Sequence, residues 1–283
     1  MTNGDIVKAG FTSVRRSPKR LIANIQGLSK SGKSRLALTA KKPIGYVAVE
    51  IGGEEGVVDQ FIPAGTESFE GIQIARIRME NPVYPAREEF KSDKDFDAAV
   101  SEAIQVAATP AVDAFYAAYY QSLESFATTV VDTGSDFWEI LRLSNFGRLE
   151  KVPQLAYGQL NKSMDKLIDD AFSAKGSVIY VHHLKELWIN VLDEKTGKTR
   201  GQASGEYGLA GYSGIKKKVQ ASIELWREDL TEADENTGMM VKFFGQVIES
   251  RHSSFAMGTR FQGDFTFADI GMAIMQSVRS DWE

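Results

Sequence analysis

The sequence predicts an α/β fold, with a mostly parallel central sheet flanked by helices and a C-terminal antiparallel extension of that sheet. Three observations carry this prediction. A short apolar segment, a glycine- and serine-rich loop and a run of helix formers follow one another over residues 21–40. Two further apolar, β-branched segments, at residues 44–50 and 128–132, each end in an acidic residue. Beyond residue 219 apolar and polar residues alternate, which is typical of strands with one buried face.

Composition narrows the class of protein. The chain has 283 residues, of which 43% are hydrophobic, so it can bury a large core. It contains no cysteine, which excludes disulfides, thiol catalysis and thiolate metal sites. No apolar run reaches the length of a signal segment or of a membrane span. We therefore expect a soluble protein of the cytoplasm, that of a bacterial host if the chain is viral, with no membrane partner.

The net charge of -5 is unevenly distributed. Residues 1–42 carry ten lysines or arginines against one acid, and residues 50–125 carry five against fifteen acids. We expect residues 1–20 to form a basic N-terminal arm and residues 21–283 to form a single domain. The arm, with Arg15, Arg16, Lys19 and Arg20, could contact a nucleic-acid backbone or an acidic neighbouring subunit, or it could be a solvated tail.

The loop at residues 27–34 matches the phosphate-binding pattern G-x-x-x-x-G-K-[ST]. In this pattern backbone N–H groups surround the phosphates, Lys33 supplies a positive charge, and Ser34 offers a hydroxyl to Mg²⁺. The apolar segment before the loop predicts a strand, and residues 35–40 predict a helix. The expected nucleotide-binding residues are Gly27, Leu28, Ser29, Lys30, Ser31, Gly32, Lys33, Ser34 and Arg35.

Two carboxylates lie at the ends of predicted strands. Glu50 follows the strand at 44–49 and is the candidate base for an attacking water. Glu54 and Glu55, in the glycine-rich turn that follows, are its rivals, and Glu50 could also be a simple strand-end carboxylate. Asp132 ends the strand at 128–132 and is the candidate Mg²⁺ ligand, with residues 133–136 predicted as a turn.

The central part of the chain reads as helical. Residues 95–108 predict one helix, and Thr109 and Pro110 form a good N-cap and first-turn pair for a second. A further amphipathic helix is predicted over residues 158–175. In the region 57–94 we expect a strand at 72–77 and a turn at 81–85. The second helix presents an apolar face that we expect to be core: Val112, Phe115, Tyr116, Tyr119, Leu123 and Phe126.

A pair of histidines follows the strand predicted at residues 177–181. Adjacent strand residues point to opposite faces, so at most one of His182 and His183 reaches a nucleotide, and we favour His183. A polar side chain there could sense a γ-phosphate. The pair is not a zinc site, because no third ligand is in view.

Residues 184–218 form a long polar stretch with seven basic and four acidic residues. Such a stretch could bind a single strand, or be an exposed hairpin with no ligand. Strands are expected near 219–225, 240–248 and 261–267, and a packing helix at 269–278. Arg251 could reach a neighbouring subunit's nucleotide, or be a surface residue. The candidate nucleic-acid contacts are Lys185, Lys195, Lys198, Arg200, Lys216, Lys217 and Lys218.

The order of these motifs resembles the RecA superfamily of ATPases, and more narrowly the compact, core-only members carried by bacteriophages, which include single-strand-annealing and recombination ATPases. The resemblance rests on residues 27–34, 47–50, 130–132 and 181–183. It implies that ATP and Mg²⁺ bind and that Lys33, Glu50, His183 and Arg251 are catalytic. It also implies that residues 143–158 and 184–218 face DNA.

The resulting expectation is a Mg²⁺-dependent ATPase that acts on single-stranded DNA in phage recombination, annealing or replication. Its expected partners are single-stranded DNA, other copies of the chain in a ring or filament, and a single-strand-binding or replication protein. One alternative is a nucleotide-switched protein-binding module with weak hydrolysis. Another is a hexameric helicase or packaging motor.

Overall fold

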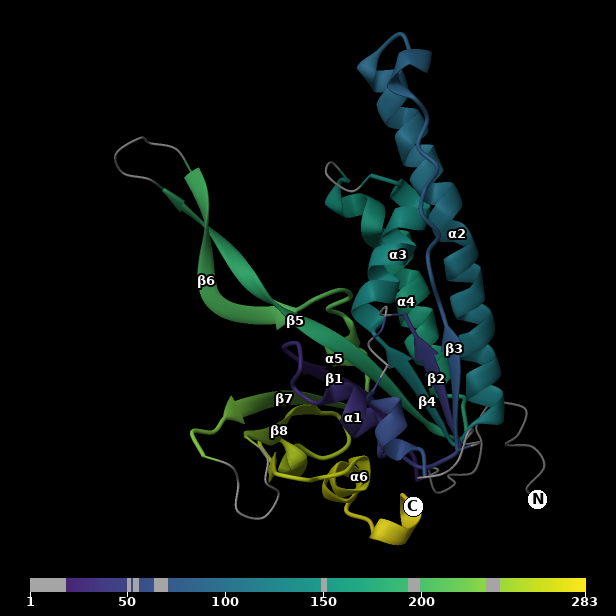
Figure 1. Cartoon of the computed structure of the whole chain (residues 1–283). Coiled ribbons are helices and arrows are strands. Elements are labelled where there is room, and N and C mark those ends of the chain that lie inside the picture. Colours follow the sequence, from purple (N-terminus) through teal and green to yellow (C-terminus); the bar gives the residue numbers. More distant parts are fainter. Residues whose placement is uncertain are drawn as a thin grey trace, which may run out of the picture.

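A mostly parallel β-sheet runs through the computed structural model of the chain (Figure 1). The structure describes residues 19–49, 52, 56–63, 71–148, 152–192, 199–232 and 240–283. Over these residues the sheet has nine strands in the order β3-β2-β4-β5-β1-β7-β8-β9, and β6 pairs with β5 outside this path. The fold class predicted from the sequence is therefore confirmed: helices flank a parallel sheet that has an antiparallel extension.

The parallel strands bring their carboxyl ends to one edge of the sheet. β5 lies between β1 and β4, and its register pairs Gly27 with His183 and Asp132 with Val181. Three sequence motifs far apart in the chain therefore meet at one edge. The parallel strands are β1 (Ile22–Gly27), β2 (Ile44–Ala48), β3 (Ile72–Arg76), β4 (Thr128–Asp132) and the first part of β5 (Ser177–Leu192).

The C-terminal extension begins with β7 (Ala221–Asp229), which is parallel to β1, and continues with β8 (Val241–Ser250) and β9 (Arg260–Gln262), both antiparallel. The strand predicted at 261–267 is shorter than expected. The strand ends at Gln262, and helix α6 (Phe267–Met275) begins after four irregular residues, where Thr266 and Asp269 form a reciprocal capping box.

Residues 184–218 contain the exposed hairpin that the sequence left open as one of two alternatives. The strand predicted to end at His182 and His183 continues to Leu192 and pairs with β6 (Thr199–Leu209), so most of the polar stretch is a long β-hairpin. The hairpin projects from the body of the molecule (Figure 1). Its β-forming residues, among them Trp188, Ile189 and Val191, favour an extended backbone. The stretch ends in the short helix α5 (Ile215–Lys218).

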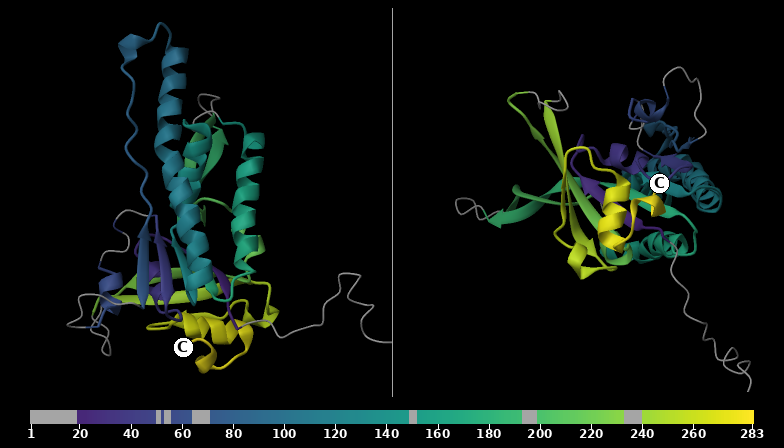
Figure 2. Two further views of the ribbon diagram at one scale, coloured as in Figure 1. Left: turned by 90° about the vertical axis from the view of Figure 1, so that its right-hand side faces the viewer. Right: turned by 90° about the horizontal axis from the view of Figure 1, so that it is seen from below.

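The two helices predicted on either side of Thr109 are one continuous helix, α2 (Asp93–Ser125). Ser92 caps its start by accepting from the N–H of Asp95. Thr109 does not cap a helix, since its hydroxyl donates to the carbonyl of Gln105 at 2.8 Å. Pro110 removes one backbone hydrogen bond, but the helix continues because its apolar face is held by α3. The N-terminal part of α2 rises above the other helices as a tower (Figure 2).

The helices cover both faces of the sheet. α2, α3 (Gly134–Phe146) and α4 (Gly158–Ala171) pack on one face around Phe115, Tyr119 and Phe137, while α1 (Lys33–Leu38) and α6 pack on the other. Five of the six residues of the predicted apolar face belong to or pack against this core, and the sixth, Phe126, is the C-cap of α2. The predicted turn at 133–136 is instead the start of α3, where Thr133 accepts from the N–H of Asp136. Short 3-10 helices lie at Val58–Phe61, Arg87–Glu89, Gln154–Tyr157, Ser254–Ala256 and Arg279–Asp281.

In the part of the chain that the structure describes, no helix is both long enough and apolar enough to cross a bilayer.

Candidate nucleotide-binding site

The phosphate loop connects the end of β1 to the start of α1, as predicted. Both motif glycines are needed where they lie. A Cβ on Gly27 would come within 2.4 Å of the carbonyl oxygen of Leu225 in the neighbouring strand. Gly32 has a φ of 87°, a left-handed conformation that side chains disfavour. A side chain at Gly27 would clash with β7, and one at Gly32 would strain the backbone of the loop.

Lys33 and Ser34 lie at the start of α1, where the motif places them. The side chain of Lys33 is only 6% exposed, and its ammonium donates to the carbonyl of Leu28 at 2.8 Å. The hydroxyl of Ser34 donates to Oδ2 of Asp132 at 2.5 Å. The two residues that the sequence assigned to Mg²⁺ therefore meet in the structure.

Asp132 is almost fully buried, at 3% exposure, at the end of β4. Tyr46 of β2 also donates its hydroxyl to Oδ2 of this carboxylate. Sequence reasoning missed Tyr46, because nothing in the local pattern of a buried strand distinguishes a tyrosine that supports a site from one that fills the core.

The residues present fit a magnesium ion. A hydroxyl and a carboxylate are both oxygen ligands of the kind Mg²⁺ prefers, and they lie together beside the phosphate loop. Among the described residues no group of three or more histidine, aspartate or glutamate side chains could hold a metal. In proteins Mg²⁺ usually takes several of its ligands from substrate phosphates and water.

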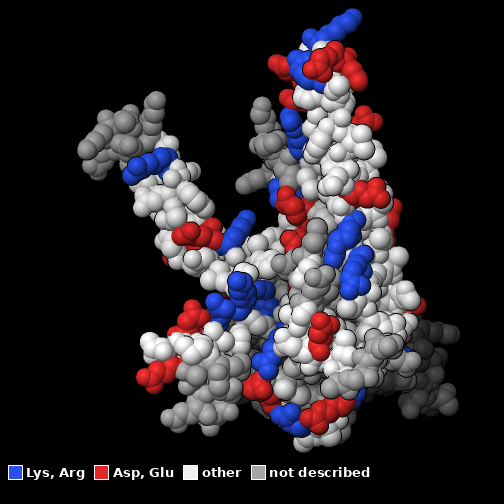
Figure 3. All heavy atoms as spheres, in the orientation of Figure 1, with Lys and Arg blue, Asp and Glu red and all other residues white. Residues whose placement is uncertain are grey.

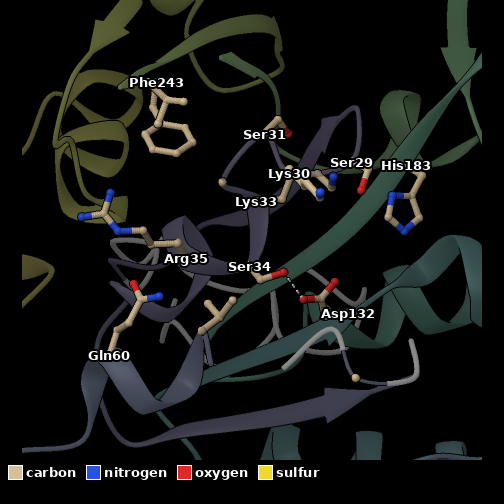
Figure 4. A pocket seen from close by; sticks show the side chains of 14 residues that line it. Ser29, Lys30, Ser31, Lys33, Ser34, Arg35, Gln60, Asp132, His183 and Phe243 are labelled. Carbon is tan, nitrogen blue, oxygen red and sulfur yellow. Dashed lines mark hydrogen bonds between the residues drawn. The ribbon is translucent and has the colours of Figure 1, made fainter. Parts of the chain in front are cut away.

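A cavity of about 700 Å³ opens over the loop (Figure 4). Asp132 and His183 lie at one end, and Phe243 and Arg35 lie at the other, with the lysines of the loop between them. Its volume is within the range of small-molecule sites. The described lining residues are Ser29, Lys30, Ser31, Gly32, Lys33, Ser34, Arg35, Gly52, Val57, Gln60, Asp132, His183, Val241 and Phe243.

The side chains of His182 and His183 lie on opposite faces of β5, as strand alternation predicts. His183 lines the cavity, and its backbone N–H donates to the hydroxyl of Ser135 at 3.0 Å. His182 is fully buried and packs against Gly134, which follows Asp132 by two residues. Burial lowers the pKa of His182 to about 3, and the nearby ammonium of Lys216 acts in the same direction.

Several predicted residues lie away from the cavity. Arg251 follows β8 at the opposite edge of the sheet from the loop, and its guanidinium donates to the carbonyl of Lys218 at 3.0 Å. Lys185 and Arg200 lie on the hairpin. Lys216, Lys217 and Lys218 form part of α5, and Lys218 pairs with Asp169 at 3.1 Å. Glu50, Glu54, Glu55, Lys195, Lys198 and residues 1–18 lie outside the described residues.

Two lining residues come from regions where the sequence suggested no chemistry. Phe243 on β8 lies against the loop: its ring is 3.1 Å from the position a Cβ of Gly32 would take. Gln60 comes from the short helix after β2. Phe243 reaches the cavity through the pairing of β8 with β7, and no motif in the local sequence marks either residue as part of a site.

The fold is an α/β fold with a mostly parallel sheet, and the site places a phosphate-loop motif beside a buried carboxylate. No protein-family model matches the sequence, and no curated protein matches it. Among solved structures, the chain is similar to the KaiC-like protein PH0186 from the hyperthermophilic archaeon Pyrococcus horikoshii OT3. The TM-score is 0.42 at 12% identity, over 87% of this chain and 85% of that one. A similarity of this size says nothing about activity.

Proposed function

We propose that the chain is a Mg²⁺-dependent ATPase of the RecA-like type that acts on single-stranded DNA in phage recombination, annealing or replication. The observation that carries the ATPase part is the hydrogen bond between Ser34 and Asp132 at the edge of the cavity. It joins the phosphate loop to the one carboxylate that the sequence assigned to the metal.

The loop supports phosphate binding in two ways. Gly27 and Gly32 allow the backbone a conformation and a close approach to β7 that a side chain would oppose, and in such a loop the N–H groups can surround an anion. The ammonium of Lys33 already points to the loop, where it donates to the carbonyl of Leu28, and phosphate oxygens would take over that hydrogen bond. Mg²⁺ bound by Ser34 and Asp132 would neutralise charge on the β- and γ-phosphates.

The other end of the cavity suits a nucleobase. The ring of Phe243 is half-buried, with Val241 beside it in the lining. An aromatic ring at the end opposite Asp132 offers a base an apolar surface while the phosphates lie in the loop. This orientation directs the γ-phosphate toward Asp132 and His183.

The candidate base for the attacking water is Glu50, which follows the described strand β2. The N–H of Val49 donates to the carbonyl of Asp132 at 2.7 Å, so the residue before Glu50 lies beside the metal ligand. We therefore retain Glu50 as the proposed base, and Glu50→Gln should abolish hydrolysis and leave ATP binding intact.

The hairpin β5–β6 is the proposed contact for single-stranded DNA. It carries Lys185 and Arg200, and two exposed aromatic side chains, Trp188 at 70% and Tyr207 at 51%. Cations and aromatic rings along an extended arm are the means by which proteins bind a single strand without reading its sequence. Figure 3 shows basic side chains on the hairpin and where it meets the body.

The proposal includes assembly into a ring or filament. Arg251 lies at the edge of the sheet opposite the phosphate loop, so it cannot reach the nucleotide of its own chain. A role for Arg251 at a nucleotide requires a second copy of the chain that offers its loop to this edge.

The first experiment measures ATP hydrolysis with and without single-stranded DNA at low salt, with Lys33→Ala as the blank. We expect turnover that rises with DNA and disappears in the variant. ATP binding with no turnover, or turnover indifferent to DNA, would instead favour a nucleotide-switched protein-binding module, for which the exposed Trp188 offers a docking point. Strand separation would identify a helicase.

A further inference from the structure

The phosphate loop contains two lysines, and the function proposed above uses only Lys33. The two side chains differ in their surroundings. Lys33 is buried against the loop, whereas Lys30 is exposed and lines the same cavity. In Figure 4 both side chains lie in the middle of the cavity, between Phe243 and His183. Lys30 is therefore in position to contact whatever the loop binds.

The backbone of Lys30 is unusual for a residue with a side chain. Its φ is 62°, in the left-handed region, and among the described residues Gln276 is the other non-glycine residue with a positive φ. Glycine adopts this conformation without steric cost, whereas lysine does not. Strain of this kind is retained mainly at functional sites. It indicates that the side chain at position 30 has a use that glycine could not supply.

The charges around the cavity support the same conclusion. Three positive side chains are found among the described lining residues. Arg35 pairs with Asp264 at 2.5 Å, and Lys33 donates to the carbonyl of Leu28. No acidic side chain in the described part of the chain forms an ion pair with Lys30. Its ammonium is therefore available to an anionic ligand.

We propose that Lys30 contacts the γ-phosphate of ATP and stabilises the transition state of hydrolysis, as a catalytic cation supplied within the chain. The inference rests on the proposed ATPase activity. In that reaction the oxygen of water bonds to the γ-phosphorus, and the bond from this phosphorus to the β–γ bridging oxygen breaks. The electron pair of the broken bond leaves with ADP, and one proton of the water passes to the base.

Negative charge grows on the bridging oxygen and is spread over the γ-phosphate oxygens during this step. Lys33 approaches the phosphates from the buried side of the loop, and Lys30 approaches from its exposed side. Because the ammonium of Lys30 lies in the cavity before the reaction, it stabilises the negative charge on the phosphate oxygens with little reorganisation.

The test compares the full chain with Lys30→Gly and Lys30→Arg. Lys30→Gly removes the ammonium and relieves the backbone, so we expect kcat to fall by about 100-fold or more. We expect affinity for ADP, which lacks the γ-phosphate, to change by less than about threefold. Lys30→Arg keeps the charge and should restore most of the rate. Turnover by Lys30→Gly at the unmodified rate would overturn the proposal, and so would an equal loss of ATP and ADP affinity.

Gln276→Gly is the matched control. It relieves the same backbone conformation at the C-terminal end of α6, outside the cavity lining. Both glycine variants should raise Tm by about 2 °C, and only Lys30→Gly should lose turnover.

A failure of the ATPase proposal can be distinguished from a failure of the proposal for Lys30. If the unmodified chain binds ATP without hydrolysing it, the proposed activity fails. The contact between Lys30 and the γ-phosphate is then tested by nucleotide affinities alone. A γ-phosphate contact then predicts that the preference for ATP over ADP falls at least about tenfold in Lys30→Gly. An unchanged preference would overturn the contact, and a chain that binds neither nucleotide would overturn both proposals.

Discussion

Ser34 and Asp132, 98 residues apart in the sequence, are joined by a hydrogen bond of 2.5 Å between the serine hydroxyl and Oδ2 of the carboxylate. Tyr46 donates to the same oxygen from β2. A helix start and two strands therefore meet at one buried oxygen atom. These hydrogen bonds fix the orientation of the carboxylate, which is what a metal ligand beside a phosphate loop requires.

Asp132→Asn should remove the effect of Mg²⁺ on ATP binding and lower kcat by about 100-fold or more, because an amide is a weaker ligand than a carboxylate. ATP titrations with and without Mg²⁺, together with turnover rates, measure both effects. Tyr46→Phe is the control, since it removes one donor to the carboxylate and leaves both metal ligands. An asparagine variant with unchanged Mg²⁺ dependence would exclude Asp132 as a ligand.

Gly134→Ala should destabilise the fold by about 2 kcal/mol, because overpacking a closed core has a cost of this size. The new Cβ would lie 2.6 Å from Nε2 of His182, which is fully buried. In urea unfolding, the double variant Gly134→Ala/His182→Ala should lose less free energy of unfolding than the sum of the two single variants, by more than about 1 kcal/mol. Gly158→Ala, at a helix start with nothing within 4 Å, should cost nothing. If the losses of stability in the two single variants simply add in the double variant, the contact between position 134 and His182 is contradicted.

His182 should make the fold sensitive to acid. Its pKa is lowered from an ordinary 6.5 to about 3, so the unfolded chain binds this proton first as pH falls. The contribution of neutral His182 to the free energy of unfolding is complete above pH 6.5. As pH falls toward 3 it is lost, by about 1.4 kcal/mol for each pH unit. Thermal unfolding between pH 4 and pH 7 measures this slope, and His182→Leu should flatten it. An equally steep curve in the variant would assign the slope to other groups.

Phe243→Ala should weaken ATP binding by about tenfold or more, because base–aromatic contacts contribute about 1–3 kcal/mol. Inorganic triphosphate, which has no base, should bind the variant and the unmodified chain equally well. Competition titrations with the two ligands separate the contact with the base from support of Gly32 by the same ring. Equal losses for both ligands would show that Phe243 acts through the loop.

The parts of the site that lie on short local patterns could be predicted from the sequence. The loop glycines, Lys33 and Ser34 form one contiguous motif, and Asp132 ends a β-branched strand. Strand alternation separated His183, which lines the cavity, from His182, which is buried. Tyr46 and Phe243 could not be found in this way, because each reaches the site through sheet pairing between distant segments.

The errors in secondary structure have the same origin. Thr109 and Pro110 form a good helix start locally, but packing of the apolar face against α3 keeps α2 continuous through them. The polar composition of residues 184–218 left a hairpin as only one of two alternatives. Pairing between β5 and β6 overrides that composition, because each strand satisfies the backbone hydrogen bonds of the other.

The two ends of strand β5 differ in the number of strands that they pair with. Its first residues are clamped between β1 and β4, His183 lies where it leaves the sheet, and residues 184–192 extend outward. At about 3.3 Å per residue this outer part is about 30 Å long. A tilt of about 5° at His183 would move the far end by about 2.6 Å, on the scale of one residue of strand. A displacement of His183 that the strand transmits without bending would therefore be larger at the far end of the hairpin than at the cavity.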